Sequence, residues 1–239
     1  MLKQKFMIAA ALLMAVVLGV QIPALASGKK AQANFKVRIE NISGSEGLTA
    51  KDGSKYPFAL SPGLFAVTES KMNFFKAGKK AGAGLEAQAE DGNPTVLRQD
   101  LLPKVGSVNL GIFNMPVGAG EAAPILPGGA YEFTFTATEG MKLNLIAMYG
   151  QSNDLFYAPK EAIELFVDGK PITGDITGRL LLWDAGTEVN QAPGIGDEQA
   201  PRQKAANTGA AENGHVGPVK DGFTYPETKD VLRVTITGE

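Results

Sequence analysis

The chain has 239 residues, a formal net charge of −2 and no cysteine. Nucleic-acid-binding proteins are usually strongly basic, so a nucleic-acid partner is not expected. Without cysteine, neither disulfides nor a lipidated cysteine can stabilise or anchor the chain, which must depend on its core and on any bound metal.

The first 26 residues have the three parts of a secretory signal peptide. Lys3 and Lys5 form a basic start, an apolar run covers 6–20, and Ala24-Leu25-Ala26 has the small-x-small pattern of a signal-peptidase site. The apolar run is short for a membrane span, and no later stretch approaches its length. We expect cleavage after Ala26 and a secreted or periplasmic protein without a transmembrane segment; a retained N-terminal anchor is the alternative.

Residues 27–33 are expected to be a flexible lead-in, and 34–239 a single domain. Alternating or continuous apolar residues predict short strands, and glycine and proline punctuation predicts two short helices between them. The expected strands are 35–39, 64–67, 107–113, 131–135, 143–148, 163–167, 179–183 and 232–236, and the expected helices are 83–90 and 95–102, the second ended by Pro103.

The clearest β signal covers 131–148. Tyr131, Phe133 and Phe135 alternate with polar residues, and Glu139-Gly140 predicts a hairpin turn to the strand 143–148. That second strand is apolar on both faces, which is typical of a central strand.

Many short strands with few helices predict an all-β sandwich. Residues 190–228 differ, since they are rich in Gly, Pro, Ala, Asn and Gln and have no periodicity. Such a long irregular segment is unusual inside a compact domain. We expect either a long surface excursion or a partly disordered segment, after which the chain returns to the sheet.

The segment Leu181-Leu182-Trp183-Asp184-Ala185-Gly186-Thr187-Glu188 is an apolar run that ends in an acidic, glycine-containing turn. Asp184 either caps this turn through backbone amides or binds a hard cation at the sheet edge. A lone tryptophan at the end of an apolar strand is more often core than ligand-binding surface, so Trp183 is expected in the core.

Four motifs follow one another along the chain: Ser61-Pro62-Gly63, the segment 84–94, Gln151-Ser152-Asn153-Asp154-Leu155-Phe156 and Trp183-Asp184-Ala185-Gly186-Thr187-Glu188. Together they resemble the spondin N-terminal domain of bacterial secreted proteins, over roughly residues 34–237. In animal members the aspartate corresponding to Asp154 is followed by tryptophan, where this chain has Leu155.

The resemblance implies a C2-like antiparallel β-sandwich with short helices in the loops, an extracellular location and a bound calcium ion. The metal ligands implied by the motifs are Asp154 and Asp184, with Asn153 and Glu188 as further candidates. If the strands before Asp154 and Asp184 end at the same end of the sandwich, the two carboxylates converge. Phe156 and Tyr157 would then form an exposed aromatic lip or fold under the sandwich edge.

The predicted function is therefore a calcium-binding module for adhesion or for binding in the cell envelope or outside the cell. Its partner is an unknown extracellular protein or polysaccharide. An enzyme is not expected, because the only histidine, His215, has no accompanying nucleophile motif or second metal ligand. Two alternatives remain open: an exported polymer hydrolase that uses Asp154 and Asp184 as an acid pair, and a metal-free structural sandwich.

Overall fold

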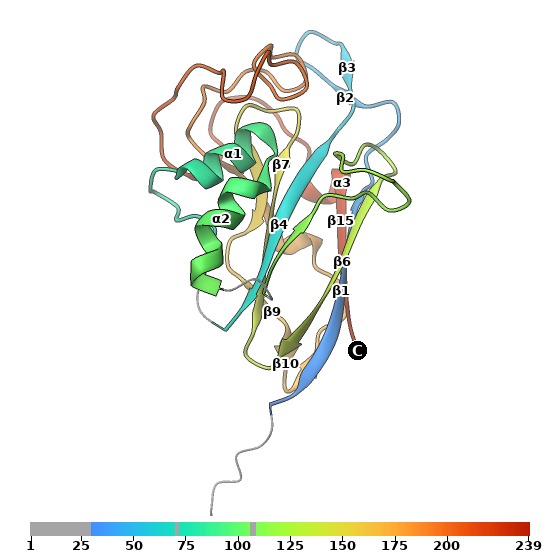
Figure 1. Ribbon diagram of the computed structural model, residues 1–239. Helices are drawn as coiled ribbons and strands as arrows, with labels where there is room; N and C mark the ends of the chain where they lie inside the picture. Colours follow the sequence, from blue (N-terminus) through green and yellow to red (C-terminus); the bar gives the residue numbers. More distant parts are fainter. Residues whose placement is uncertain (1–29, 70–71, 106–108) are drawn as a thin grey trace, which may run out of the picture.

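A computed structural model describes residues 30–69, 72–105 and 109–239. The predicted signal peptide, 1–26, lies outside these residues. Within them the chain forms two antiparallel β-sheets that pack face to face, with a few short helices, so the prediction of an all-β sandwich is confirmed (Figure 1). No helix in the described ranges is long and apolar enough to cross a membrane.

The smaller sheet has four strands in the order β12-β15-β1-β6. Their bounds are Gly174–Asp175 (β12), Leu232–Gly238 (β15), Gln32–Asn41 (β1) and Ala130–Thr138 (β6). The first and last long strands are neighbours, since Val37 lies opposite Ile236. The strand β1 begins at Gln32 and buries Ala33, so the expectation that the lead-in extends to residue 33 was wrong at its end.

The larger sheet has seven strands, in the order β14-β13-β8-β7-β4-β5 with β9 paired to β7. Their bounds are Gly217–Pro218 (β14), Leu180–Asp184 (β13), Leu155–Pro159 (β8), Lys142–Tyr149 (β7), Leu60–Thr68 (β4), Leu110–Phe113 (β5) and Ile163–Glu164 (β9). Two further two-stranded ribbons join β2 (Leu48–Thr49) to β3 (Lys55–Tyr56) and β10 (Phe166–Val167) to β11 (Lys170–Pro171).

The predicted hairpin between β6 and β7 was wrong. The strand β6 pairs with β1 in the smaller sheet, whereas β7 pairs with β4, β8 and β9 in the larger one. The turn at Glu139-Gly140 therefore carries the chain from one sheet to the other. Both strands bury apolar side chains in the inter-sheet core, where Phe133 of β6 stacks on Phe65 of β4, the neighbour of β7, with ring centroids 4.2 Å apart.

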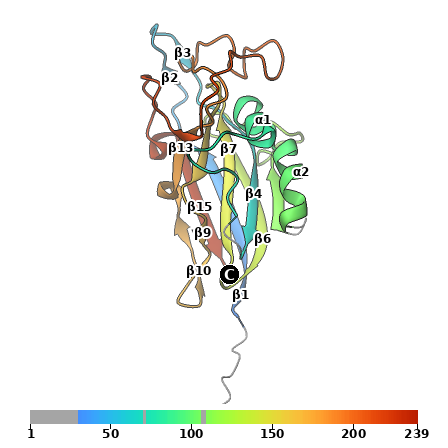
Figure 2. The same ribbon diagram turned by 90° about the vertical axis from the view of Figure 1, so that its left-hand side faces the viewer.

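The larger sheet is covered on both faces, and Figure 2 shows α1 and α2 beside β4 and β7. Its inner face contacts the smaller sheet, and its outer face contacts helices α1 (Ala83–Asp91) and α2 (Pro94–Val105). The prediction that β7 is central and apolar on both faces is confirmed, because Leu145 packs in the inter-sheet core and Ile146 in the outer core. Pro103 lies inside α2 and does not end it, because burial of Leu97 and Leu101 against the sheet outweighs the local cost of the proline.

Trp183 is buried in the outer core, as predicted. Its indole Nε1 donates a hydrogen bond of 3.1 Å to the carbonyl of Ala158, and its ring meets Phe75 edge-on. Phe156 and Tyr157 are also buried, one on each face of the sheet, so they fold under the sandwich edge and form no exposed lip.

Residues 190–228 form a surface excursion over one end of the sandwich, above α1 in Figure 1. Apart from β14, they contain turns and irregular backbone up to the short helix α3 (Thr228–Val231). Arg202 fixes the segment: its Nη1 donates to Gln151 at 2.9 Å, its Nε donates to the carbonyl of Gly196 at 2.8 Å, and its Nη2 donates to Gln199.

Candidate metal centre

Strand pairing brings the two predicted aspartates together. The strands β7 and β13 are both antiparallel to β8, so they end at the same end of the sandwich. Asp184 is the last residue of β13 and lies opposite Leu155, the first residue of β8. Asp154, directly before Leu155, is therefore beside Asp184, and its carbonyl accepts a hydrogen bond from Ala185.

The Asp154 carboxylate is fully buried and only half satisfied. Its Oδ2 accepts hydrogen bonds from the Thr187 amide at 2.7 Å, the Thr187 hydroxyl at 3.1 Å and the Glu188 amide at 3.2 Å. Its Oδ1 is buried and has no hydrogen-bond donor. Burial, followed by the nearby Asp184 charge, raises the pKa of Asp154 to about 7.

Asp184 caps its own turn. Its Oδ1 accepts a hydrogen bond of 2.7 Å from the Gly186 amide, and its Oδ2 accepts one of 2.8 Å from the side-chain amide of Asn190. The other amide atom of Asn190, Oδ1, is buried without a donor. Burial raises the pKa of Asp184.

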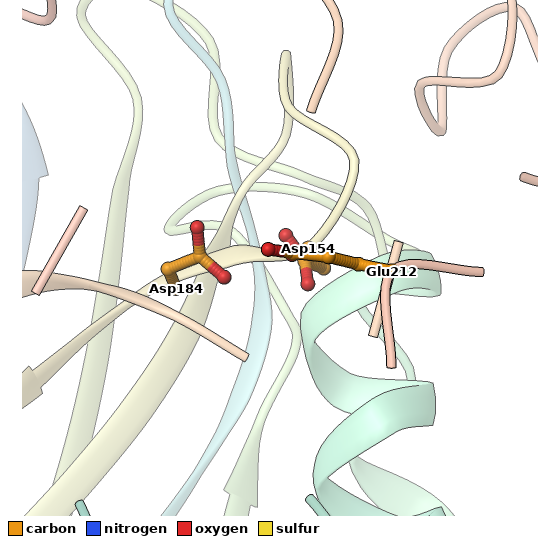
Figure 3. A group of neighbouring side chains, drawn as sticks. All are labelled: Asp154, Asp184 and Glu212. Carbon is orange, nitrogen blue, oxygen red and sulfur yellow. The ribbon is translucent and has the colours of Figure 1, made fainter. Parts of the chain in front are cut away.

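Glu212 is a third carboxylate at this place, and sequence reasoning missed it. One carboxylate oxygen each of Asp154, Asp184 and Glu212 lies within 4.8 Å of the others (Figure 3). The segment that carries Glu212 is held against the Asp184 turn, because the Glu212 amide donates to the Thr187 carbonyl at 2.9 Å and Gly214 donates to Gly186 at 2.7 Å. Glu212 comes from the aperiodic segment 190–228, where no pattern in the sequence marks its position.

The close approach of these two segments requires glycine at position 186. Gly186 has φ of +67°, and a Cβ there would lie 2.6 Å from the backbone nitrogen of His215. A side chain would therefore be strained by the positive φ and would also push the 211–214 segment away.

Asn153 and Glu188, the other predicted ligands, lie beside the carboxylate group and not within it. The Glu188 carboxylate accepts hydrogen bonds from the Gly209 amide at 2.8 Å and from the Asn153 side chain at 3.3 Å. The Asn153 Oδ1 accepts one from the Gln191 amide at 2.9 Å. Their polar atoms thus hold the loops around Asp154 together.

A further buried acid, Glu90 on α1, lies behind the group. It is 2% exposed, and its Oε2 has no hydrogen-bond donor. Burial raises its pKa to about 7, and the charges of Glu188 and Asp154 add to the effect, although the Thr187 hydroxyl opposes it. Glu90 lies within the motif 84–94, but nothing in that motif marks it as a buried acid beside the carboxylate group.

The donor set fits a hard divalent cation. All three group members offer carboxylate oxygen, which calcium prefers, and the buried Oδ1 of Asp154 lacks any other partner. None of the ion pairs among residues 30–69, 72–105 and 109–239 involves these three side chains. A cation would therefore supply the positive charge that the protein itself does not.

The carboxylate group forms part of the wall of an open cavity of about 610 Å³. Asp184 and Glu212 line it, whereas Asp154 lies behind them. The other polar side chains in its lining are Asn190, His215, Lys220 and Asp221.

The fold and this group define an all-β, antiparallel sandwich with a cluster of three carboxylates at one end. Comparison with models of known protein families and with curated protein sequences finds no match to the chain.

Proposed function

We propose that this protein is an exported, spondin-type β-sandwich module that binds calcium through Asp154, Asp184 and Glu212. The ordered loops around the ion would present a binding surface for adhesion or for attachment to an extracellular or cell-envelope partner. Export rests on the signal-peptide pattern of residues 1–26, and the family resemblance rests on the order of the four motifs.

The observation that carries the cation site is the Oδ1 atom of Asp154. An ionised carboxylate oxygen that is buried without a donor is costly, unless a proton or a cation compensates its charge. Two other carboxylates within 4.8 Å make a shared cation the best compensation, because each of them adds to the same negative potential.

Calcium fits better than zinc or magnesium. The group contains no histidine or cysteine, the ligands that structural zinc sites commonly use. The three carboxylates come from a loop, a strand end and an irregular segment, and calcium tolerates such irregular arrangements better than magnesium, which demands a near-ideal octahedron.

The ion would act as a link between three parts of the chain. Loop 150–154, the end of β13 and the segment around Glu212 would share one ion, which offsets the repulsion between their carboxylates. We expect binding to order this end of the sandwich while leaving the sheets unchanged.

The two alternative functions, a polymer hydrolase and a metal-free structural sandwich, explain fewer features of the carboxylate group. A hydrolytic acid pair must touch its substrate, but Asp154 is 0% exposed. The turn-capping role of Asp184 is present, through Gly186, yet it leaves the bare Oδ1 atom of Asp154 unexplained.

Calcium titration of the mature chain, 27–239, tests the proposal. Isothermal calorimetry should show binding, and calcium should raise the melting temperature above that measured in a chelator. Asp154→Asn and Asp184→Asn should abolish both effects, whereas Asp197→Asn, at an exposed aspartate outside the group, should retain them. An unchanged melting temperature and no heat of binding for the wild-type chain would refute the calcium site.

A further inference from the structure

The cavity beside the carboxylate group lies next to a second hollow. The first, of about 610 Å³, and the second, of about 580 Å³, share Pro218, Lys220 and Asp221 in their linings. We call the two hollows together the loop groove. Its first end contains the carboxylates of Asp184 and Glu212, and its second end contains Phe223 and Tyr225.

A cation at the first end would have protein on one side only. Asp154 approaches from the buried side, and Asp184 and Glu212 form the boundary with the cavity. Calcium takes six to eight oxygen ligands, and two of the three carboxylates, Asp154 and Asp184, already accept hydrogen bonds from Thr187, Gly186 and Asn190. The remaining coordination positions would face the loop groove and accept oxygen atoms from a ligand.

The charge of the groove disfavours an anionic ligand. Asp184, Glu212, Asp221 and Glu227 line the groove and Asp154 lies behind it, whereas Lys220 and one divalent ion supply the positive charge, which leaves a small negative excess. An anionic ligand would be repelled by this excess, whereas hydroxyl groups can donate to the carboxylates and coordinate the ion at once.

The second end supplies apolar and aromatic surface. Phe223 and Tyr225 are half-buried there, and the Tyr225 hydroxyl is fixed by a 2.6 Å hydrogen bond to Asp221. Val189, 48% exposed, adds apolar surface in the first hollow. Rigid aromatic rings beside polar groups suit a ligand with apolar ring faces and a hydroxylated rim.

We infer that the loop groove binds a neutral oligosaccharide, with two vicinal hydroxyls on the cation held by Asp184 and Glu212 and a neighbouring sugar ring against Phe223 and Tyr225. This inference rests on the proposed calcium site and adds to it the chemical class of the partner. Two adjacent hollows with shared lining residues suit a chain of sugars better than a single sugar.

Calorimetry with mannohexaose tests the inference on the calcium-loaded mature chain. We expect binding that is lost in a chelator. It should also be lost with mannohexaose treated with periodate, which cleaves the carbon–carbon bonds of its vicinal diols, and then reduced to convert the resulting aldehydes to alcohols. Polygalacturonate serves as the anionic probe, and we expect it to bind at least tenfold more weakly. Binding of mannohexaose that survives the chelator, or preferred binding of polygalacturonate, would overturn the inference.

Variants separate the sugar site from the cation site. Phe223→Ala removes aromatic surface from the groove, and Val189→Phe fills the first hollow. Each variant should weaken mannohexaose binding at least tenfold but keep the calcium-induced rise in melting temperature. Val189 is exposed, so its variant should fold even if Phe223→Ala does not. Leu126→Ala, at an exposed leucine outside the groove, should change neither property.

The outcomes distinguish the two proposals. If calcium stabilises the protein but no millimolar binding of mannohexaose is found, the sugar site is refuted and the calcium site stands. If calcium itself does not bind, both are refuted.

Discussion

Thr187 donates two hydrogen bonds to one oxygen of Asp154, from its amide at 2.7 Å and its hydroxyl at 3.1 Å, and none to the other oxygen. The strand-end turn that begins at Asp184 therefore fixes the orientation of the Asp154 carboxylate. One oxygen serves to hold the turn, and the other is buried without a hydrogen-bond donor. Under the proposed function, this second oxygen is the one available to a cation.

Glu212 should contribute to affinity without contributing to metal-free stability. It is exposed, and its amide, not its side chain, holds the segment in place. We expect Glu212→Gln to weaken calcium binding roughly tenfold or more, since calcium affinity depends on the charge of its ligands, and to raise the melting temperature in a chelator slightly, because it removes the repulsion between Glu212 and Asp184. Fluorescence of Trp183, the only tryptophan and the neighbour of Asp184, offers a readout. Glu121→Gln, at an exposed glutamate in another loop, is the control; equal affinities for both variants would contradict a ligand role.

In the absence of calcium, stability should fall as the pH rises from about 5 to about 7. Asp154 and Glu90 have folded-state pKa values of about 7, above those of the unfolded chain near 4, so the folded protein holds protons that the unfolded chain releases across this window. Acids whose pKa is lowered, such as Glu40 and Asp175, act in the opposite direction but at lower pH. Melting temperatures in a chelator at pH 5 and pH 7 test the sign.

Asp154→Asn should reduce this pH dependence, because the amide does not titrate. With calcium bound, the trend should reverse, since the ion requires ionised carboxylates and its affinity falls as the pH drops through about 7. A wild-type chain and an Asp154→Asn chain with identical pH profiles in a chelator would show that Asp154 does not titrate as described.

Gly186→Ala should destabilise the fold and displace the segment that carries Glu212. The positive φ costs about 1–3 kcal/mol for a residue other than glycine, and the added Cβ would lie 2.6 Å from the His215 nitrogen. Chemical denaturation measures the loss of stability, and calorimetry should show weaker calcium binding. Gly178→Ala is the matched control, because no atom lies within 4 Å of its added Cβ and its φ is not positive. Equal stability of the two variants would be the contrary result.

Arg202→Lys should loosen the 190–228 segment without unfolding the sandwich. Lysine cannot replace the separate contacts that the guanidinium makes with Gly196, Gln151 and Gln199. Limited proteolysis should then cut the segment faster, while the melting temperature of the sheets changes little. Lys204→Arg, at an exposed neighbour, should be cut at the wild-type rate. A protease pattern unchanged in Arg202→Lys would mean that other contacts hold the segment.

Much of the fold follows from local patterns in the sequence. Alternation in 35–39 and 232–236, and continuous apolar residues in 143–148, locate strands correctly because side chains on a strand point to opposite faces. The same patterns do not name the partner of a strand. Glu139-Gly140 has the residues of a hairpin turn, yet it joins two sheets, since the choice depends on which buried faces meet across the core.

The site residues likewise fall into those that local sequence patterns indicate and those that they do not. Asp154 and Asp184 each follow an apolar strand, so their convergence depends only on two strands that end at one end of the sandwich. Glu212 and Glu90 join them through contacts far apart in the sequence, from an irregular segment and from a helix, where no local pattern distinguishes them from solvent-facing acids.

The pairing of β1 with β15 also sets an order on folding. The strand β1 lies between β6 and β15, so its second edge stays open until the last residues of the chain are available. During synthesis, which starts at the N-terminus, β1, β6 and the larger sheet can form early. At that stage the smaller sheet still lacks β15. Contacts of such wide sequence separation slow folding, and loss of the final few residues would expose a long strand edge to pairing with other chains. The strand β15 thus completes the smaller sheet, and chains that lack it, whether nascent or truncated, should be the forms most prone to aggregate.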